Sequence, residues 1–177
     1  MVVLTADYFL FPLGSGDFVE SFFYTVCIRA ENHKWGQRFP CIMNELFYGE
    51  LPYKHLKKAR RELRELFSVF RQIPPSQSVW ITSDGKEPWI DHVDEAAENL
   101  ADFYLSEEKL NLIRLMGGAI LRAMKQKCPL KLESVVYDVL SLDSIEDLDE
   151  ALGDSTLEDF LREYEPDGFE GNEDNKR

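Results

Sequence analysis

The sequence predicts an α+β fold in which a three- to four-stranded, mostly antiparallel sheet packs against three main helices, with an acidic helical C-terminal extension. Three observations predict this arrangement. Short runs rich in β-branched and aromatic residues alternate with longer stretches in which apolar residues recur every three or four positions. The chain has 177 residues, 44% of them hydrophobic, which suffices for one domain with a core. Acidic residues are concentrated beyond position 137, which divides an α+β domain at 1–137 from an extension at 138–177.

Four stretches are candidate strands. The run VVLTADYFLF predicts a buried first strand over about 2–11, and SVWIT predicts a short strand at 78–82. Residues 100–105 fit either a short strand or the end of a helix, and we favour the strand. Apolar and polar residues alternate at the start of LKLESVVY, which predicts a last strand over 130–137.

Three longer stretches are candidate helices. The first covers 17–30, with Asp17 as its N-cap, although its aromatic and β-branched content leaves a strand open. The second covers 53–71, where an apolar stripe faces a surface rich in Lys and Arg. That basic surface fits a solvated helix face or a docking face for acidic residues. The third covers 106–127, where Ser106 is the candidate N-cap.

The segment between the first two helices has an unusual composition. The sequence WGQRFP at 35–40 precedes a short candidate helix at 41–48, which Pro40 can open and Gly49 can end. No helix or strand period explains why Trp, Arg and Pro lie so close together. The segment therefore needs a specific structural or functional explanation.

Two interpretations of this segment stay open. Tryptophan and arginine are enriched at the energetic centres of protein interfaces, which makes Trp35 and Arg38 candidate partner-binding residues. Alternatively, Trp35 and Phe39 fill the core while Arg38 binds carbonyl oxygens or Glu45.

The net charge of −13 is unevenly distributed. Residues 1–137 carry 18 acidic and 17 basic side chains, whereas residues 138–177 carry 15 acidic and three basic ones, giving net charges of −1 and −12. A nearly neutral body with an acidic extension argues against a nucleic-acid partner and permits a basic protein partner. The extension contains two short amphipathic patterns, opened by Ser144 and Ser155, before an end that we expect to be disordered. A solvated tail that only aids solubility is the alternative.

Several functional classes lack support in the sequence. We expect a cytoplasmic protein, because we find neither a membrane-spanning run nor a secretory signal. The three cysteines form no CxxC pair, the three histidines have no metal-ligand spacing, and no phosphate-binding glycine motif occurs. We therefore predict no metal, no cofactor and no enzymatic activity. A thiol nucleophile formed by Cys41 with His55 stays open, although no local motif supports it.

Five short motifs together carry a family resemblance. GSGDF (14–18), SFF (21–23), WGQRFP (35–40), MNELFYGEL (43–51) and PW (88–89) occur in order within residues 4–135 and resemble immunity protein family 70 of bacterial polymorphic toxin systems. The sequence departs mildly from the family pattern, with Phe47-Tyr48 where the family tends to have one aromatic residue. The resemblance implies a small intracellular protein that binds and neutralises a cognate toxin, as in contact-dependent inhibition. It implies no catalytic residues.

The leading prediction is accordingly a non-enzymatic inhibitor of a toxin domain, and a nuclease whose basic cleft the acidic extension covers is the toxin class that we favour. The alternative is a regulatory or adaptor module whose acidic helices dock on its own basic helix at 53–71. Nucleic acid and membrane are not predicted partners. The candidate partner-binding residues are Trp35, Arg38, Glu45, Tyr48, Trp89, Asp147, Glu150, Glu158 and Asp159.

Overall fold

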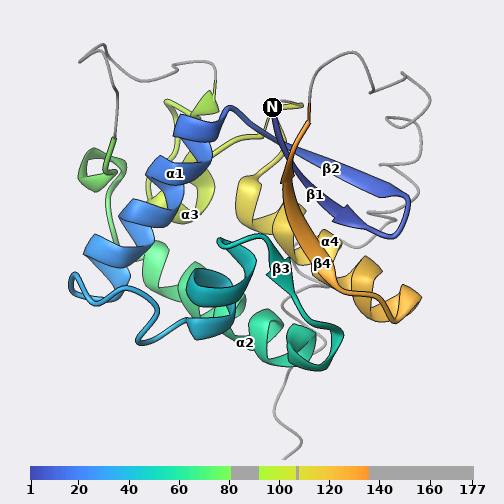
Figure 1. Cartoon of the computed structure of the whole chain (residues 1–177). Helices are drawn as coiled ribbons and strands as arrows, with labels where there is room; N and C mark the ends of the chain where they lie inside the picture. The colour runs from blue at the N-terminus through green and yellow to red at the C-terminus, as the bar shows by residue number, and fades with distance from the viewer. Residues whose placement is uncertain (81–91, 107, 136–177) are drawn as a thin grey trace, which may run out of the picture.

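A computed structural model describes residues 1–80, 92–106 and 108–135 (Figure 1). In these residues a four-stranded sheet packs against helices, which confirms the predicted α+β class. The strands are β1 (Val2–Ala6), β2 (Phe9–Gly14), β3 (Glu50–Leu51) and β4 (Leu130–Ser134). Their order in the sheet is β2-β1-β4-β3, and every neighbouring pair is antiparallel.

The prediction of one strand over 2–11 is wrong, because the chain reverses there to form the β1–β2 hairpin. Leu4 pairs with Phe11 and Ala6 with Phe9. Asp7, at the turn, has a φ of 60°, a conformation that Asp tolerates better than most residues. The turn contains no glycine or proline, so the sequence has no turn signal between the two apolar runs and they were predicted as one strand.

The remaining strand predictions have mixed outcomes. The last strand is confirmed over β4, and residues 136–137 lie outside the described part of the chain. The two-residue strand β3 was not predicted, and its Leu51 pairs with Leu130. Residues 78–80 form no strand, while 81–82 lie outside the described residues.

Two of the three predicted main helices are confirmed closely. Helix α1 (Gly16–Thr25) continues as a π-helix, η1 (Val26–Ala30), and together they cover the predicted 17–30. Its N-cap is Ser15 rather than Asp17, because the Ser15 hydroxyl accepts a hydrogen bond from Phe18 N. Helix α2 (Leu56–Phe70) follows a 3₁₀ turn, η3 (Tyr53–His55), and confirms the helix predicted at 53–71.

The region from 100 to 127 departs more from the prediction. Residues 100–105 do not form a strand; Leu100–Phe103 is the short helix α3, because the side chain of Asn99 caps two backbone N–H groups. Helix α4 (Leu112–Gln126) starts later than predicted, and Asn111 rather than Ser106 is its N-cap. The Ser106 hydroxyl instead accepts from Leu110 N in the preceding turn. A further 3₁₀ turn, η4, covers Pro75–Gln77.

The core lies where the sheet and the three long helices meet. Helix α4 packs against β1 and β2 (Figure 1). Helix α2 packs against α4 and against the short helix η2 (Cys41–Leu46). The buried ring of Phe22 makes edge contacts with the buried rings of Phe70 and Tyr104, and its contact with Phe70 joins α1 to α2. Among the described residues, no helix has the length and apolar character needed to cross a bilayer.

Candidate partner-binding site

The segment from Glu31 to Tyr48 connects α1–η1 to β3 and contains the WGQRFP sequence. It consists of an irregular loop, 31–40, followed by a second π-helix, η2 (Cys41–Leu46). Two π-helices, η1 and η2, therefore flank one ten-residue loop. Short π segments are rare in proteins and are found frequently at functional sites.

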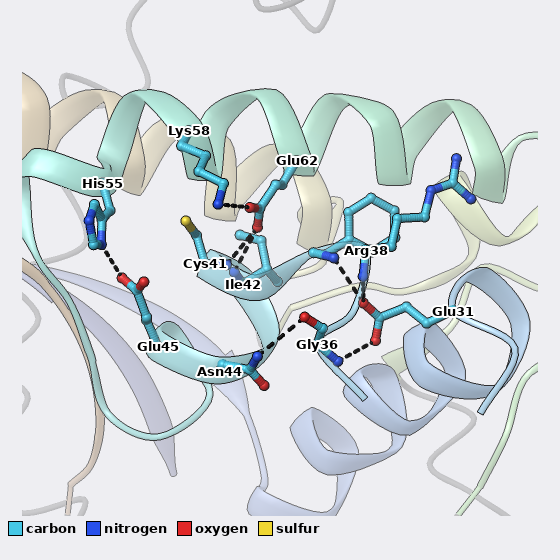
Figure 2. Close-up of polar contacts among 11 residues, drawn as sticks. Glu31, Gly36, Arg38, Cys41, Ile42, Asn44, Glu45, His55, Lys58 and Glu62 are labelled. Carbon is cyan, nitrogen blue, oxygen red and sulfur yellow. Dashed lines mark hydrogen bonds and ion pairs between the residues drawn. The ribbon is translucent and has the colours of Figure 1, made fainter. Parts of the chain in front are cut away.

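The carboxylate of Glu31 organises the loop. Glu31 is only 4% exposed. One oxygen accepts from Gly36 N at 2.7 Å, and the other accepts from Arg38 N at 2.9 Å and Phe39 N at 2.8 Å (Figure 2). Three backbone donors that regular secondary structure would otherwise satisfy are thus satisfied by one side chain. Glu31 holds the WGQRFP backbone in its turn.

A second buried carboxylate, that of Glu62 on α2, caps the start of η2. Its Oε2 accepts from Cys41 N at 2.8 Å and Ile42 N at 3.1 Å (Figure 2). The first N–H groups of a helix lack partners within the helix, so an acceptor from elsewhere is needed. Burial raises the pKa of Glu62, while these hydrogen bonds and Lys58 oppose the shift. Glu62 therefore fixes η2 to α2.

Trp35 lies between α1 and η2 and is partly buried. Its indole N–H donates to Met43 O at 3.1 Å. Its ring makes edge contacts with Tyr24, at 5.6 Å between centroids, and with Phe47, at 4.8 Å. Phe47 in turn contacts Tyr48, whose side chain is 71% exposed. We call Tyr24, Trp35, Phe47 and Tyr48 the aromatic patch.

Arg38 ties the loop to its surroundings. Its Nε and a terminal nitrogen both lie 2.7 Å from Glu65 Oε1, and another terminal nitrogen donates to Ala30 O at 3.3 Å. Its guanidinium also lies over the ring of the fully buried Phe39. These contacts match the bracing interpretation, with Glu65 as the carboxylate partner. Glu45, the partner that the sequence suggested, contacts His55 instead.

Glu45, His55 and Cys41 form a separate cluster. His55 Nδ1 lies 2.8 Å from Glu45 Oε2, and the Cys41 sulfur lies within 4.8 Å of a ring nitrogen of His55 and a carboxylate oxygen of Glu45 (Figure 2). Burial, followed by the negative charges of Glu62 and Glu45, raises the pKa of Cys41 to about 12. The thiol therefore stays protonated at neutral pH, so Cys41 is not the activated nucleophile that its pairing with His55 suggested.

Comparison with known proteins identifies the family. The family model described as immunity protein 70 matches residues 4–132. The chain belongs to the immunity protein 70 family. No curated protein and no solved structure matches it. The match confirms the resemblance carried by the five sequence motifs and implies, at the level of the family, neutralisation of a toxin.

Four of the nine predicted partner-binding residues lie in the described part of the chain, and their contacts differ. Trp35 and Tyr48 belong to the aromatic patch, whereas Arg38 pairs with α2 and Glu45 with His55. The others lie outside the described residues: Trp89, Asp147, Glu150, Glu158 and Asp159.

The residues that support this region were not predicted from the sequence. In the sequence, Glu31 is one of four polar residues at 31–34, and Glu62 is one acid within the Lys- and Arg-rich stretch 53–71. Tyr24 and Phe47 were not predicted as partner-binding residues either. Glu31 directly precedes an irregular loop whose backbone N–H groups need acceptors, and this position is the sequence signal that could have identified it. Only the folded chain shows that its carboxylate turns inward to accept those hydrogen bonds.

Proposed function

We propose that this protein is a non-enzymatic immunity protein that binds a cognate toxin domain in the cytoplasm of the producing cell. Binding would block the active site or substrate surface of the toxin, as in a polymorphic toxin or contact-dependent inhibition system. The match to the immunity protein 70 family over residues 4–132 is the observation that carries this proposal. The raised pKa of Cys41 also fits a function without a thiol nucleophile.

The aromatic patch is the part of the described surface best suited to contact the toxin. Aromatic residues dominate the energetic centres of interfaces, and Tyr48 is the most exposed member of the patch. Glu31 and Glu62 fix the backbone beneath it through five hydrogen bonds. A surface that is already rigid loses less conformational entropy when it binds. Arg38 and Glu45, each already paired within the chain, fit the rim of such an interface.

Growth rescue and affinity measurements test the proposal. A toxin domain encoded beside the gene of this protein, identified by inspecting the neighbouring genes, is co-expressed with wild-type protein, and the affinity of the purified pair is measured by calorimetry. Wild-type protein should restore growth. Tyr48→Ala should weaken toxin binding at least tenfold, as expected for a central aromatic residue. Absence of both rescue and binding by the wild type would contradict the immunity function itself.

Tyr8 offers a matched control for this experiment. It is 80% exposed and lies on the β1–β2 turn, which Figure 1 shows on the side of the molecule away from α1. Tyr8→Ala should bind the toxin as the wild type does. Equal effects of the two substitutions, or none from Tyr48→Ala, would exclude the aromatic patch as the toxin-binding surface while leaving the immunity function intact.

The acidic extension at 138–177 is proposed to add a second contact, in which Asp147, Glu150, Glu158 and Asp159 face a basic cleft on a nuclease toxin. Its net charge of −12 motivates this step. Deleting 138–177 should weaken toxin binding and reduce its salt dependence, measured at two salt concentrations. Unchanged affinity and salt dependence would refute the contact.

The extension could dock instead on the exposed basic side chains of α2, which include Lys57, Lys58 and Arg61. In that arrangement deletion would leave toxin affinity unchanged or improved. Replacing Lys57 and Arg61 by Gln, and leaving Lys58 in place beside Glu62, would then lower the thermal stability of the full chain but not that of residues 1–137. This comparison separates toxin contact from self-docking.

A further inference from the structure

Three potential metal ligands of different chemistry meet at one point beside η2. They are the Cys41 sulfur, a carboxylate oxygen of Glu45 and a ring nitrogen of His55, and these three atoms lie within 4.8 Å of one another. Cys41 and Glu45 lie one turn apart on η2, while His55 ends η3. The turn through Gly49 and the short strand β3 bring the two elements together. The spacing of Cys41, Glu45 and His55 in the sequence matches no common metal-binding motif, so the sequence did not predict this cluster.

We propose that Cys41, Glu45 and His55 bind one zinc ion. Thiolate sulfur, imidazole nitrogen and carboxylate oxygen are the three ligand types that zinc takes from proteins. Harder cations such as Mg²⁺ and Ca²⁺ select oxygen ligands alone, so the sulfur and nitrogen favour zinc. Three protein ligands leave the fourth tetrahedral position for a water molecule.

The geometry requires only local adjustment. Zinc–ligand distances of about 2.0–2.3 Å place tetrahedral ligand atoms roughly 3.3–3.8 Å apart. The 2.8 Å distance between His55 Nδ1 and Glu45 Oε2 must increase slightly to reach this range. The other distances between ligand atoms are at most 4.8 Å, so any that exceed the range need to shorten by at most about 1 Å. The side chains of His55 and Glu45 are 38% and 28% exposed, so they can rotate and admit an ion from solvent. Cys41 is buried and supplies a fixed third ligand.

The charges around the cluster also suit a divalent cation. The carboxylates of Glu45 and Glu62 both lie close to Cys41, and Lys58 is a positively charged group beside them. Glu62 Oε1 is buried and accepts no hydrogen bond from the described residues, while Lys58 Nζ lies 3.9 Å from it. A dication beside Cys41 would balance this excess of negative charge and would replace the thiol proton, which leaves to solvent.

The bound ion would join η2 to η3 across the turn that carries Tyr48. Such a link reduces the conformational freedom of residues 47–54, so the ion would have a structural role. Zinc should therefore stabilise the folded chain in proportion to its affinity. This inference is independent of the proposed immunity function, because it concerns binding and stability of the protein alone.

Metal titration of the full chain, without an affinity tag, tests the site. Metal-free protein is titrated with zinc by calorimetry and with cobalt as a spectroscopic substitute. We expect one ion per chain, a higher melting temperature with zinc, and a thiolate-to-cobalt charge-transfer band. Failure to bind zinc at tens of micromolar, or cobalt binding without the thiolate band, would overturn the proposal.

Matched variants locate the ligands. His55→Asn and Glu45→Gln alter partly exposed side chains and should weaken zinc binding at least tenfold, and Cys41→Ser should abolish the charge-transfer band. The controls His33→Asn and Cys128→Ser change residues outside the cluster and should bind zinc normally. If Cys41→Ser does not fold, His55→Asn still decides the question. Unchanged affinity in His55→Asn would refute the assignment.

Discussion

Glu31 should be among the residues on which the fold depends most, and Glu31→Ala tests this directly. The substitution leaves three backbone N–H groups without their acceptor, those of Gly36, Arg38 and Phe39. The bonds to Gly36 and Phe39 are buried, whereas that to Arg38 is partly buried and its N–H can turn to water. The loss therefore concerns mainly two donors.

The magnitude follows from the burial of those two donors. A buried donor left unsatisfied costs about 1–3 kcal/mol. For two such groups, with some relaxation of the loop, we expect Glu31→Ala to lower the free energy of unfolding by about 3–4 kcal/mol. That is a large part of the 5–15 kcal/mol typical of a domain. Glu31→Gln keeps one oxygen acceptor and should lose roughly half as much.

Urea unfolding, followed by tryptophan fluorescence, measures the effect. The midpoint should fall while the slope with denaturant stays constant, because the surface exposed on unfolding does not change. Glu20→Ala is the control, since Glu20 is an exposed acid on α1 and its removal should change stability by less than about 0.5 kcal/mol. A loss below about 1 kcal/mol for Glu31→Ala would refute the role assigned to this carboxylate.

Three further predictions concern the same region and the thiols. Gly36→Ala should destabilise by at least about 2 kcal/mol in the same assay, because φ is 66° and an added Cβ would collide with the Asn44 side chain. Burial raises the pKa of Glu62, so the folded state holds its proton more tightly than the unfolded state does. Relative to Glu62→Gln, the wild type should therefore lose stability as pH rises from the ordinary value of about 4.3 through the raised folded value, and a gain over that range would contradict it. Among the three thiols, the partly exposed Cys128 should react first with a disulfide reagent, while the two buried ones should react only on unfolding.

The sequence predicted best those elements whose signal repeats along the chain. Helix α2 carries an apolar stripe over four turns, and its boundaries were nearly correct. The β1–β2 turn and α3 were missed because each depends on one local feature, the φ of Asp7 or the cap from Asn99. Strand β3 has two residues and exists only because β4 lies beside it.

The candidate site was predictable only in part, for a different physical reason. Motif residues such as Trp35 stand out by composition, whereas the role of Glu31 and Glu62 depends on which carboxylates the fold turns inward. An acid on a helix is usually solvated, so its residue type alone gives no sign of burial. The proximity of Cys41 to His55 likewise arises from the turn between them rather than from helical spacing.

The contacts of the WGQRFP segment separate residues that build the site from residues available to a partner. The only donor of the Trp35 indole is already bonded to Met43 O, and its ring is held between Tyr24 and Phe47. Trp35→Ala should therefore reduce stability and toxin affinity together, since it removes a support of the patch. Tyr48, which is 71% exposed, should affect affinity alone. Loss of affinity in a Trp35→Ala variant of unchanged stability would show that the tryptophan itself meets the partner.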